Sequence, residues 1–213
     1  MKKRMLTLIC MVSLCLFLLT AAIGLPIYIR PFYYAHIDAF DLPARSGYTA
    51  EEIRDAYDEV LDYLTLPGKD FGTGVIPHSS EGKAHFEDCK VLFELNAAVL
   101  VGSGLVLAVL FALRKKWGPY RLDKHSAAFW AAVLSVTAPI MIGGLAALDF
   151  DRAFVVFHSI FFPGKTNWVF DWHRDQIIRV LPQEFFMDCA ILIGVGLIAM
   201  AVGILVWEGK RKK

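Results

Sequence analysis

The sequence has no internal repeat, no low-complexity linker and only four cysteines among its 213 residues. None of these cysteines forms a C-x-x-C pair, and no H-E-x-x-H motif is present. The usual sequence signs of a dithiol or zinc site are therefore missing. Charged residues make up only 20% of the chain, and the formal net charge is +1. Without a basic surplus, the composition gives no indication of nucleic-acid binding.

Apolar residues, in contrast, make up 56% of the sequence and are clustered in long uncharged runs. A helix needs about 20 consecutive apolar residues to cross a bilayer. Four stretches meet this requirement, at about residues 5–29, 91–113, 126–148 and 185–207, the last with one acid, Asp188, near its start. We therefore predict an all-α, polytopic membrane protein with four transmembrane helices, in a single membrane domain over residues 1–213.

The first apolar stretch could instead be a cleaved signal peptide, because Thr20 and Ala22 are small enough for a cleavage site. Its uncharged run is longer than the core of a typical signal peptide. We therefore expect it to remain as a membrane anchor.

Charge asymmetry predicts the orientation. The segments before the first span, between the second and third spans, and after the fourth span hold 12 of the 22 basic residues and only two acids, Asp123 and Glu208. Cytoplasmic segments of membrane proteins carry such an excess of lysine and arginine. We therefore place both termini in the cytoplasm, and residues 30–90 and 149–184 on the extracytoplasmic side of the membrane.

The first outer segment contains a predicted amphipathic helix. Thr49 and Glu52 have the spacing of a capping box, in which each side chain satisfies a free backbone donor of the other. Apolar residues then recur at helical spacing until Pro67-Gly68, at Ile53, Ala56, Tyr57, Val60, Leu61 and Leu64. Further on, Ser79, Ser80 and Glu81 can start the second long helix. We expect an extracytoplasmic cap of amphipathic and interfacial helices.

The second outer segment is rich in aromatic residues but is interrupted by Pro163-Gly164. It is too broken to span the bilayer and too aromatic for an ordinary solvated loop. Aromatic side chains gather at the membrane–water interface, so we expect this segment to lie there.

Two histidines, His85 and His158, lie among apolar residues near the predicted outer membrane boundary, and Asp88 follows His85 on the same helical face. A histidine titrates near neutral pH and can transfer protons, while a carboxylate can fix its tautomer. A buried structural role for each ring is the simpler alternative. A metal site built from His85, Asp88 and His158 is another, although His-x-x-Asp alone is a weak metal signal. Cys89 could be a nucleophile, but a small buried residue is the simpler interpretation.

Cys89 and Cys189 both lie near the outer ends of predicted spans. A disulfide between them is compatible with an oxidising compartment, but the sequence does not decide whether they pair.

At these residues the sequence resembles a known family, the bacterial lipoprotein intramolecular transacylases, which are small four-span membrane proteins. The resemblance depends on AHFEDCKVLF at residues 84–93, and on FHSIFFP at residues 157–163 followed by Asn167-Trp168. Length and topology fit over the whole chain. Cys89 departs from the aliphatic residue expected at that place, which argues against a Cys89 nucleophile.

The resemblance implies an acyltransferase without a cofactor or metal. Its substrate would be a diacylated bacterial lipoprotein held with membrane lipid, with no nucleic acid involved. The enzyme would move the sn-2 acyl chain of an S-diacylglyceryl cysteine to the α-amino group of that cysteine, giving a lyso-form N-acyl lipoprotein. His85, His158 and Asp88 are the expected catalytic residues, with Asp88 orienting His85.

Five further residues are expected to bind the substrate: Phe157, Phe161, Phe162, Asn167 and Trp168. A non-enzymatic membrane accessory protein or lipid-binding scaffold explains the aromatic segment equally well. It gives no reason for His85 and His158 to be needed together.

Overall fold

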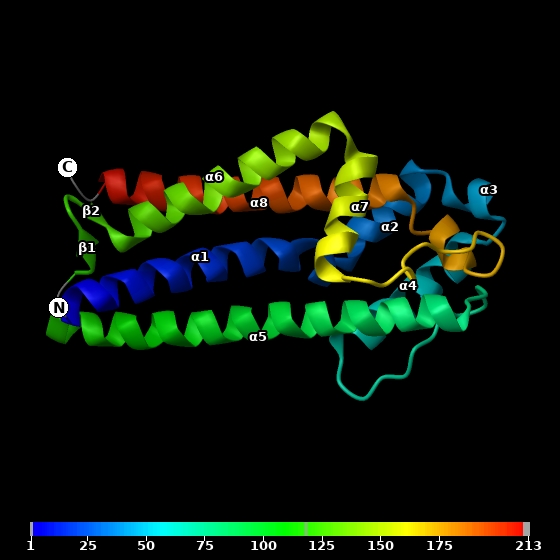
Figure 1. The fold of residues 1–213 in the computed structure, drawn as a ribbon, viewed down its shortest axis with the longest axis horizontal. Helices are drawn as coiled ribbons and strands as arrows, with labels where there is room; N and C mark the ends of the chain where they lie inside the picture. The colour runs from blue at the N-terminus through cyan, green and yellow to red at the C-terminus, as the bar shows by residue number, and fades with distance from the viewer. Residues whose placement is uncertain (1, 118, 211–213) are drawn as a thin grey trace. The chain divides into compact units, whose positions relative to one another are not determined.

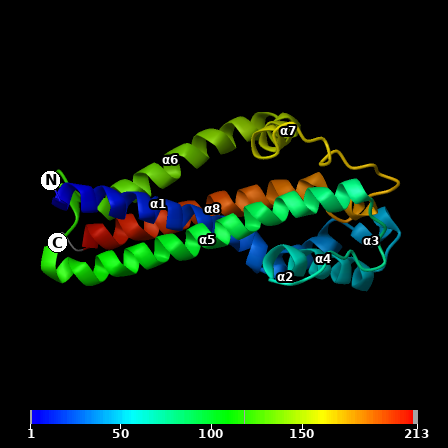
Figure 2. The same cartoon turned by 60° about the horizontal axis from the view of Figure 1, so that its bottom comes forward.

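A computed structural model describes residues 2–117 and 119–210, which are mainly helical (Figures 1 and 2). The helices and strands follow in the order α1 (Lys2–Tyr28), α2 (Arg30–Ala39), α3 (Leu42–Ser46), α4 (Ala50–Thr65), α5 (Ser80–Trp117), β1 (Arg121–Leu122), β2 (His125–Ser126), α6 (Ala127–Leu148), α7 (Phe150–Phe161), the 3-10 helix η1 (Gln176–Arg179) and α8 (Gln183–Lys210).

Four of these helices, α1, α5, α6 and α8, are long and apolar enough to cross a membrane. Only 11–28% of the residues in each most apolar window are buried within the protein. Such large exposed apolar surfaces are unusual for a soluble protein, whereas a bilayer would cover them. The four predicted spans are therefore confirmed as helices, and α5 begins well before residue 91, at Ser80.

The chain divides into two compact units. The first comprises Met1–Leu25, Asn96–Ala147 and Ile191–Lys213, and the second comprises Pro26–Leu95 and Leu148–Ala190. The boundaries fall within α1, α5 and α8 and at the end of α6. The prediction of one continuous membrane domain stays a prediction.

The first unit holds most of the apolar length of the four long helices. Leu18 and Ala22 of α1 pack against Leu197 of α8. The beginning of α1, the β1–β2 hairpin and the end of α8 lie at the same end of this unit (Figures 1 and 2). Lys2, Lys3 and Arg4 of α1, Arg121 and Lys124 of the hairpin and Lys210 of α8 therefore give this end of the unit positive charge.

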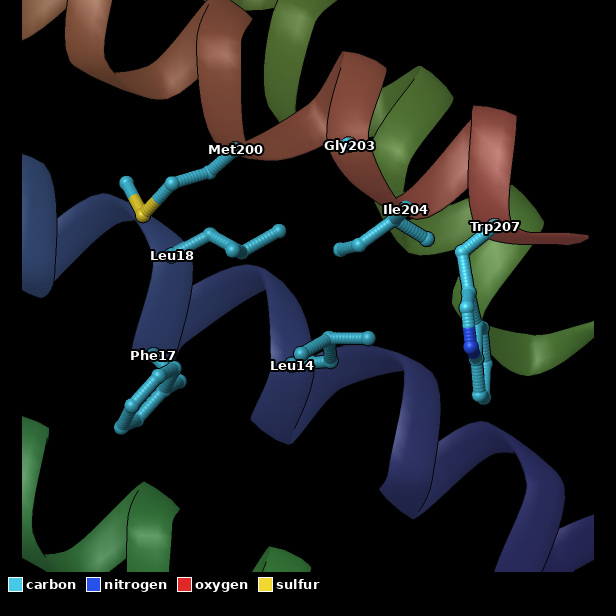
Figure 3. Close-up of a pocket in the computed structure, with 7 residues that line it drawn as sticks. All are labelled: Leu14, Phe17, Leu18, Met200, Gly203, Ile204 and Trp207. Carbon is cyan, nitrogen blue, oxygen red and sulfur yellow. The ribbon is translucent and has the colours of Figure 1, made fainter.

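A groove of about 440 Å³ lies in the first unit between α1 and α8, as Figure 3 shows. Its lining is almost entirely apolar, with Leu14, Phe17 and Leu18 from α1 and Met200, Gly203, Ile204 and Trp207 from α8. Because no lining side chain can accept a proton or act as a nucleophile, this groove cannot perform acyl transfer.

The second unit is built around α4. Thr49 and Glu52 form the predicted capping box, and all six predicted apolar positions of the helix are buried. Tyr33 of α2 stacks on Tyr57 of α4 with 3.8 Å between ring centroids, and its hydroxyl donates to the carbonyl oxygen of Val180 at 2.6 Å. This core joins α2, α4 and the residues after η1 without using the two candidate histidines.

Candidate active site

The first turn of α5 is fixed firmly just before His85. The Ser79 hydroxyl accepts a hydrogen bond from the Gly82 amide at 3.0 Å, which caps the helix. The Ser79 amide in turn donates to Asp175 at 2.7 Å, and the Asp175 side chain is buried. His85 therefore lies shortly after a helix start that these hydrogen bonds hold in place.

The helix α7 carries the second histidine. Its N-cap residue, Asp149, accepts a hydrogen bond from the Arg152 amide at 2.9 Å. His158 is buried, whereas the apolar residues around it on α7 are exposed, including Phe157 and Phe161. The helix thus has an exposed apolar face, and its single buried residue is the candidate histidine.

The two histidine rings lie close together, with 5.7 Å between their centroids. Phe162, which is only 4% exposed, contacts both of them, at 5.0 Å from His85 and 5.7 Å from His158. Residues 73 positions apart in the sequence thus share one aromatic enclosure. The structure brings together the pair that the sequence singled out.

The hydrogen bond made by His158 fixes its tautomer. Its Nδ1 atom lies 2.8 Å from the carbonyl oxygen of Phe154. Because a carbonyl only accepts, Nδ1 must carry the proton, and in the neutral ring Nε2 holds the lone pair. Burial lowers the pKa of His158 below its ordinary value, and the hydrogen bond to Phe154 opposes this shift. The neutral ring is therefore favoured near pH 7.

Only one ring nitrogen of His85 has a hydrogen-bond partner among the described residues. Its Nε2 atom lies 3.4 Å from the Cys89 sulfur. Its Nδ1 atom is buried and has no hydrogen-bond partner among residues 2–117 and 119–210. A buried polar atom without a partner is costly, so this nitrogen is suited to a group supplied by a substrate.

Asp88 does not form the expected hydrogen bond with His85. Its two carboxylate oxygens are taken by the second outer segment: one pairs with the Lys165 ammonium, and the other accepts from the Asn167 side-chain amide at 3.0 Å. Local spacing on α5 could not show this, because both partners lie almost 80 residues away.

The remaining aromatic residues complete the enclosure. Trp168 stacks on His158 with 4.6 Å between centroids, and Phe170 meets the His85 ring edge-on at 5.5 Å. Phe157 lies beside both His158 and Phe161 but is about half exposed. Sequence reasoning missed Lys165 and Phe170. For Phe170, the density of aromatic residues was a signal, whereas a lysine in a loop gave none.

Another histidine, His36, has a partner that the sequence did not indicate. Its Nε2 atom lies 3.0 Å from Asp188 of α8, and its Nδ1 atom lies 2.6 Å from the carbonyl oxygen of Phe32. Both nitrogens are thus engaged, Nδ1 within α2 and Nε2 across to α8, and the ring is not available to a substrate.

The sequence left open a metal site and a disulfide between Cys89 and Cys189. Within the described parts of the chain, no three or more histidine, cysteine, aspartate or glutamate side chains come together as a ligand set, so His85, Asp88 and His158 do not form one. All four cysteines, each within the described ranges, are free thiols; Cys89 and Cys189 are therefore not paired.

Comparison with known proteins supports one family. A search of curated protein sequences gives no match. The structure of the membrane-integral lipoprotein intramolecular transacylase Lit from Bacillus cereus superposes with a TM-score of 0.88 at 26% identity, covering 100% of this chain and 99% of that one. Two mutants of that enzyme, in which one histidine is replaced by alanine or arginine, match at 24% identity with TM-scores of 0.82 and 0.81. These cover 100% of this chain and 96% and 95% of theirs, and support the fold alone.

The sequence model described as lipoprotein intramolecular transacylase Lit matches residues 8–186, which is most of the chain. The four long apolar helices agree with a membrane-integral enzyme of this kind. The chain belongs to the lipoprotein intramolecular transacylase family Lit.

Proposed function

We propose that His85 and His158 form the catalytic pair of this acyltransferase. The reaction would move the sn-2 acyl chain of an S-diacylglyceryl cysteine to the α-amino group of that cysteine. The observation that carries the proposal is the approach of two buried imidazoles to 5.7 Å inside one aromatic enclosure. Each ring comes from a different outer segment, and neither is needed for the core around α4.

His158 is assigned as the general base. Its Nδ1 proton is held by the Phe154 carbonyl, so the lone pair of Nε2 is the one that can accept a proton. The substrate's α-amino group has an ordinary pKa of about 7.7–8 and must be neutral to attack. A neutral imidazole beside it can take the proton released as the nitrogen–carbon bond forms.

His85 is assigned as the group that stabilises the oxyanion and assists the leaving group. If the Cys89 thiol donates to Nε2, the proton of His85 resides on Nδ1, the buried atom without a partner. A hydrogen-bond donor fixed in a water-poor site is effective against developing negative charge. Asp88 contributes charge nearby rather than a hydrogen bond to this ring.

The reaction balances without an external reagent. The amine attacks the ester carbonyl, its proton passes to His158, and the tetrahedral oxyanion is stabilised by His85. Collapse breaks the bond to the glycerol oxygen, which takes up the proton held by His158, so an ester is exchanged for an amide and a free hydroxyl and both imidazoles end neutral. Both reacting groups belong to one lipoprotein, so correct positioning supplies much of the acceleration.

The site would work at the extracytoplasmic surface, with both termini in the cytoplasm. In support, the basic segments gather at one end of the first unit. The exposed apolar face of α7 gives the second unit a surface suited to the bilayer interface, where membrane lipid and the substrate's acyl chains would lie. This face includes Val155, Val156, Phe157, Ile160 and Phe161.

Replacing His158 by glutamine and by alanine tests the proposal. Glutamine retains a donor for the Phe154 carbonyl but cannot act as a base. Because the product is an isomer of the substrate, the assay uses a synthetic diacylated lipopeptide and follows loss of the free amine by amine-reactive labelling and tandem mass spectrometry. Both variants should lose activity by about 10²–10⁴-fold. Ser159→Ala, on the exposed face of α7, is the matched control. Wild-type turnover in His158→Gln would rule out the base.

A further inference from the structure

The segment that follows α7 forms the wall around both histidine rings. Phe162 contacts both rings, Trp168 stacks on His158, and Phe170 meets His85. Contacts between aromatic rings therefore hold both ends of this segment in place. The contacts that hold the middle of this segment therefore also hold its aromatic rings against the two imidazoles.

The middle of the segment is fixed to α5 through one carboxylate. Lys165 forms an ion pair with Asp88, and Asn167 donates to the other oxygen of that carboxylate at 3.0 Å. The indole nitrogen of Trp168 donates to the Lys165 carbonyl oxygen at 3.0 Å. Lys165 thus connects α5 on one side with the ring that stacks on His158 on the other.

We propose that Lys165 is a positioning residue for the transacylation, acting with Asp88 as a latch that holds residues 162–170 against both histidines. This inference rests on the catalytic roles proposed above for the two rings. It also gives Asp88 a different role from the one that sequence spacing suggested: Asp88 anchors the opposite segment instead of orienting His85.

The latch is expected to influence turnover more than folding. The Lys165 side chain is 49% exposed and that of Asp88 is 21% exposed, and such pairs contribute little to the stability of a fold. Catalysis is more sensitive, because a displacement of about 1 Å of a reacting group can cost about 10²-fold in rate. A small loosening of the segment would therefore appear in kcat while the folded state persists.

The test compares Lys165→Met, Lys165→Arg and Asp88→Asn with the double variant Lys165→Met/Asp88→Asn, in the full-length protein with the diacylated lipopeptide. Lys165→Met should lower kcat by about tenfold, the scale of coupling between contacting residues, with little change in KM. Arginine can still pair with the carboxylate and should restore most of the activity. The kcat of the double variant should be no lower than that of the slower single variant, because both changes break the same contact between Lys165 and Asp88.

Lys83→Met is the matched control, because Lys83 forms an ion pair with Glu87 on the same helix but does not reach the second outer segment. Thermal unfolding of each variant separates loss of turnover from loss of fold. Wild-type kcat in Lys165→Met, independent and multiplicative losses in the double variant, or a Lys165→Arg variant as slow as Lys165→Met would each overturn the latch. Including His158→Ala in the series separates the two hypotheses: full activity in that variant would overturn the catalytic pair itself.

Discussion

Phe162 offers a sensitive test of the enclosure, because its ring contacts both histidine rings. Its side chain is only 4% exposed. Truncating a buried phenylalanine to alanine typically costs about 3–5 kcal/mol of stability, partly through the cavity that remains. In Phe162→Ala the two imidazoles would lose their common neighbour, and a displacement of about 1 Å would lower kcat by about 10²-fold.

Two further variants make this prediction specific. Phe162→Leu keeps an apolar group in place and leaves a smaller cavity, so it should lose less stability and less turnover than Phe162→Ala. Phe157 lies on α7 and is 47% exposed. The melting temperature of Phe157→Ala should therefore fall much less than that of Phe162→Ala. Thermal unfolding in detergent and the lipopeptide assay provide the two readouts. Unchanged melting temperature and kcat in Phe162→Ala would refute the reasoning.

Three other predictions follow from the site and the orientation. Because burial lowers the pKa of His158, the base should be mainly neutral from about pH 7 upwards. Between about pH 7 and the amine's pKa of about 7.7–8, log(kcat/KM) should rise with pH with a slope of no more than about one, because only the substrate amine loses its proton; a slope of two would contradict this. Cys89→Ala should lower activity only in part, because it removes the thiol that can hold the His85 tautomer, whereas complete loss would indicate a covalent acyl-enzyme. Single cysteines introduced at Asp70 or His173 should react with an impermeant thiol reagent on whole cells, and one at Lys124 only after lysis. The reverse pattern would overturn the proposed topology.

The fold was largely predictable because its signals are local. Four long apolar runs predicted the four helices that can cross a membrane, and that prediction is confirmed. The Thr49–Glu52 capping box and the buried face of α4 were equally readable, since both depend on residues within a few turns. The start of α5 at Ser80 was also readable, because Ser79, Ser80 and Glu81 were predicted to begin the second long helix.

The site was predictable only in part. The meeting of His85 and His158 followed from their apolar surroundings at the predicted outer boundary. The partners of Asp88 did not, because pairing with Lys165 and Asn167 depends on how two distant segments pack. The tautomer of His158 could not be predicted, because it depends on a hydrogen bond to the Phe154 carbonyl that only the folded structure shows.

The family resemblance is confirmed, and with it the prediction of an acyltransferase that modifies lipoproteins. The alternative of a non-enzymatic scaffold is wrong, because the matching family and the superposing structure are transacylases. The membrane orientation and the roles of the individual site residues stay predictions.

The most direct test of the catalytic pair is the turnover of His85→Ala, His158→Ala and the double variant, measured side by side on the diacylated lipopeptide. Groups that act as one unit give strongly non-additive losses. Each single variant should lose about 10²–10⁴-fold in kcat/KM, and the double variant should lose little more than the worse single one, with each protein at normal abundance in the membrane. Near wild-type turnover in either single variant, or losses that multiply in the double variant, would contradict the two-histidine site.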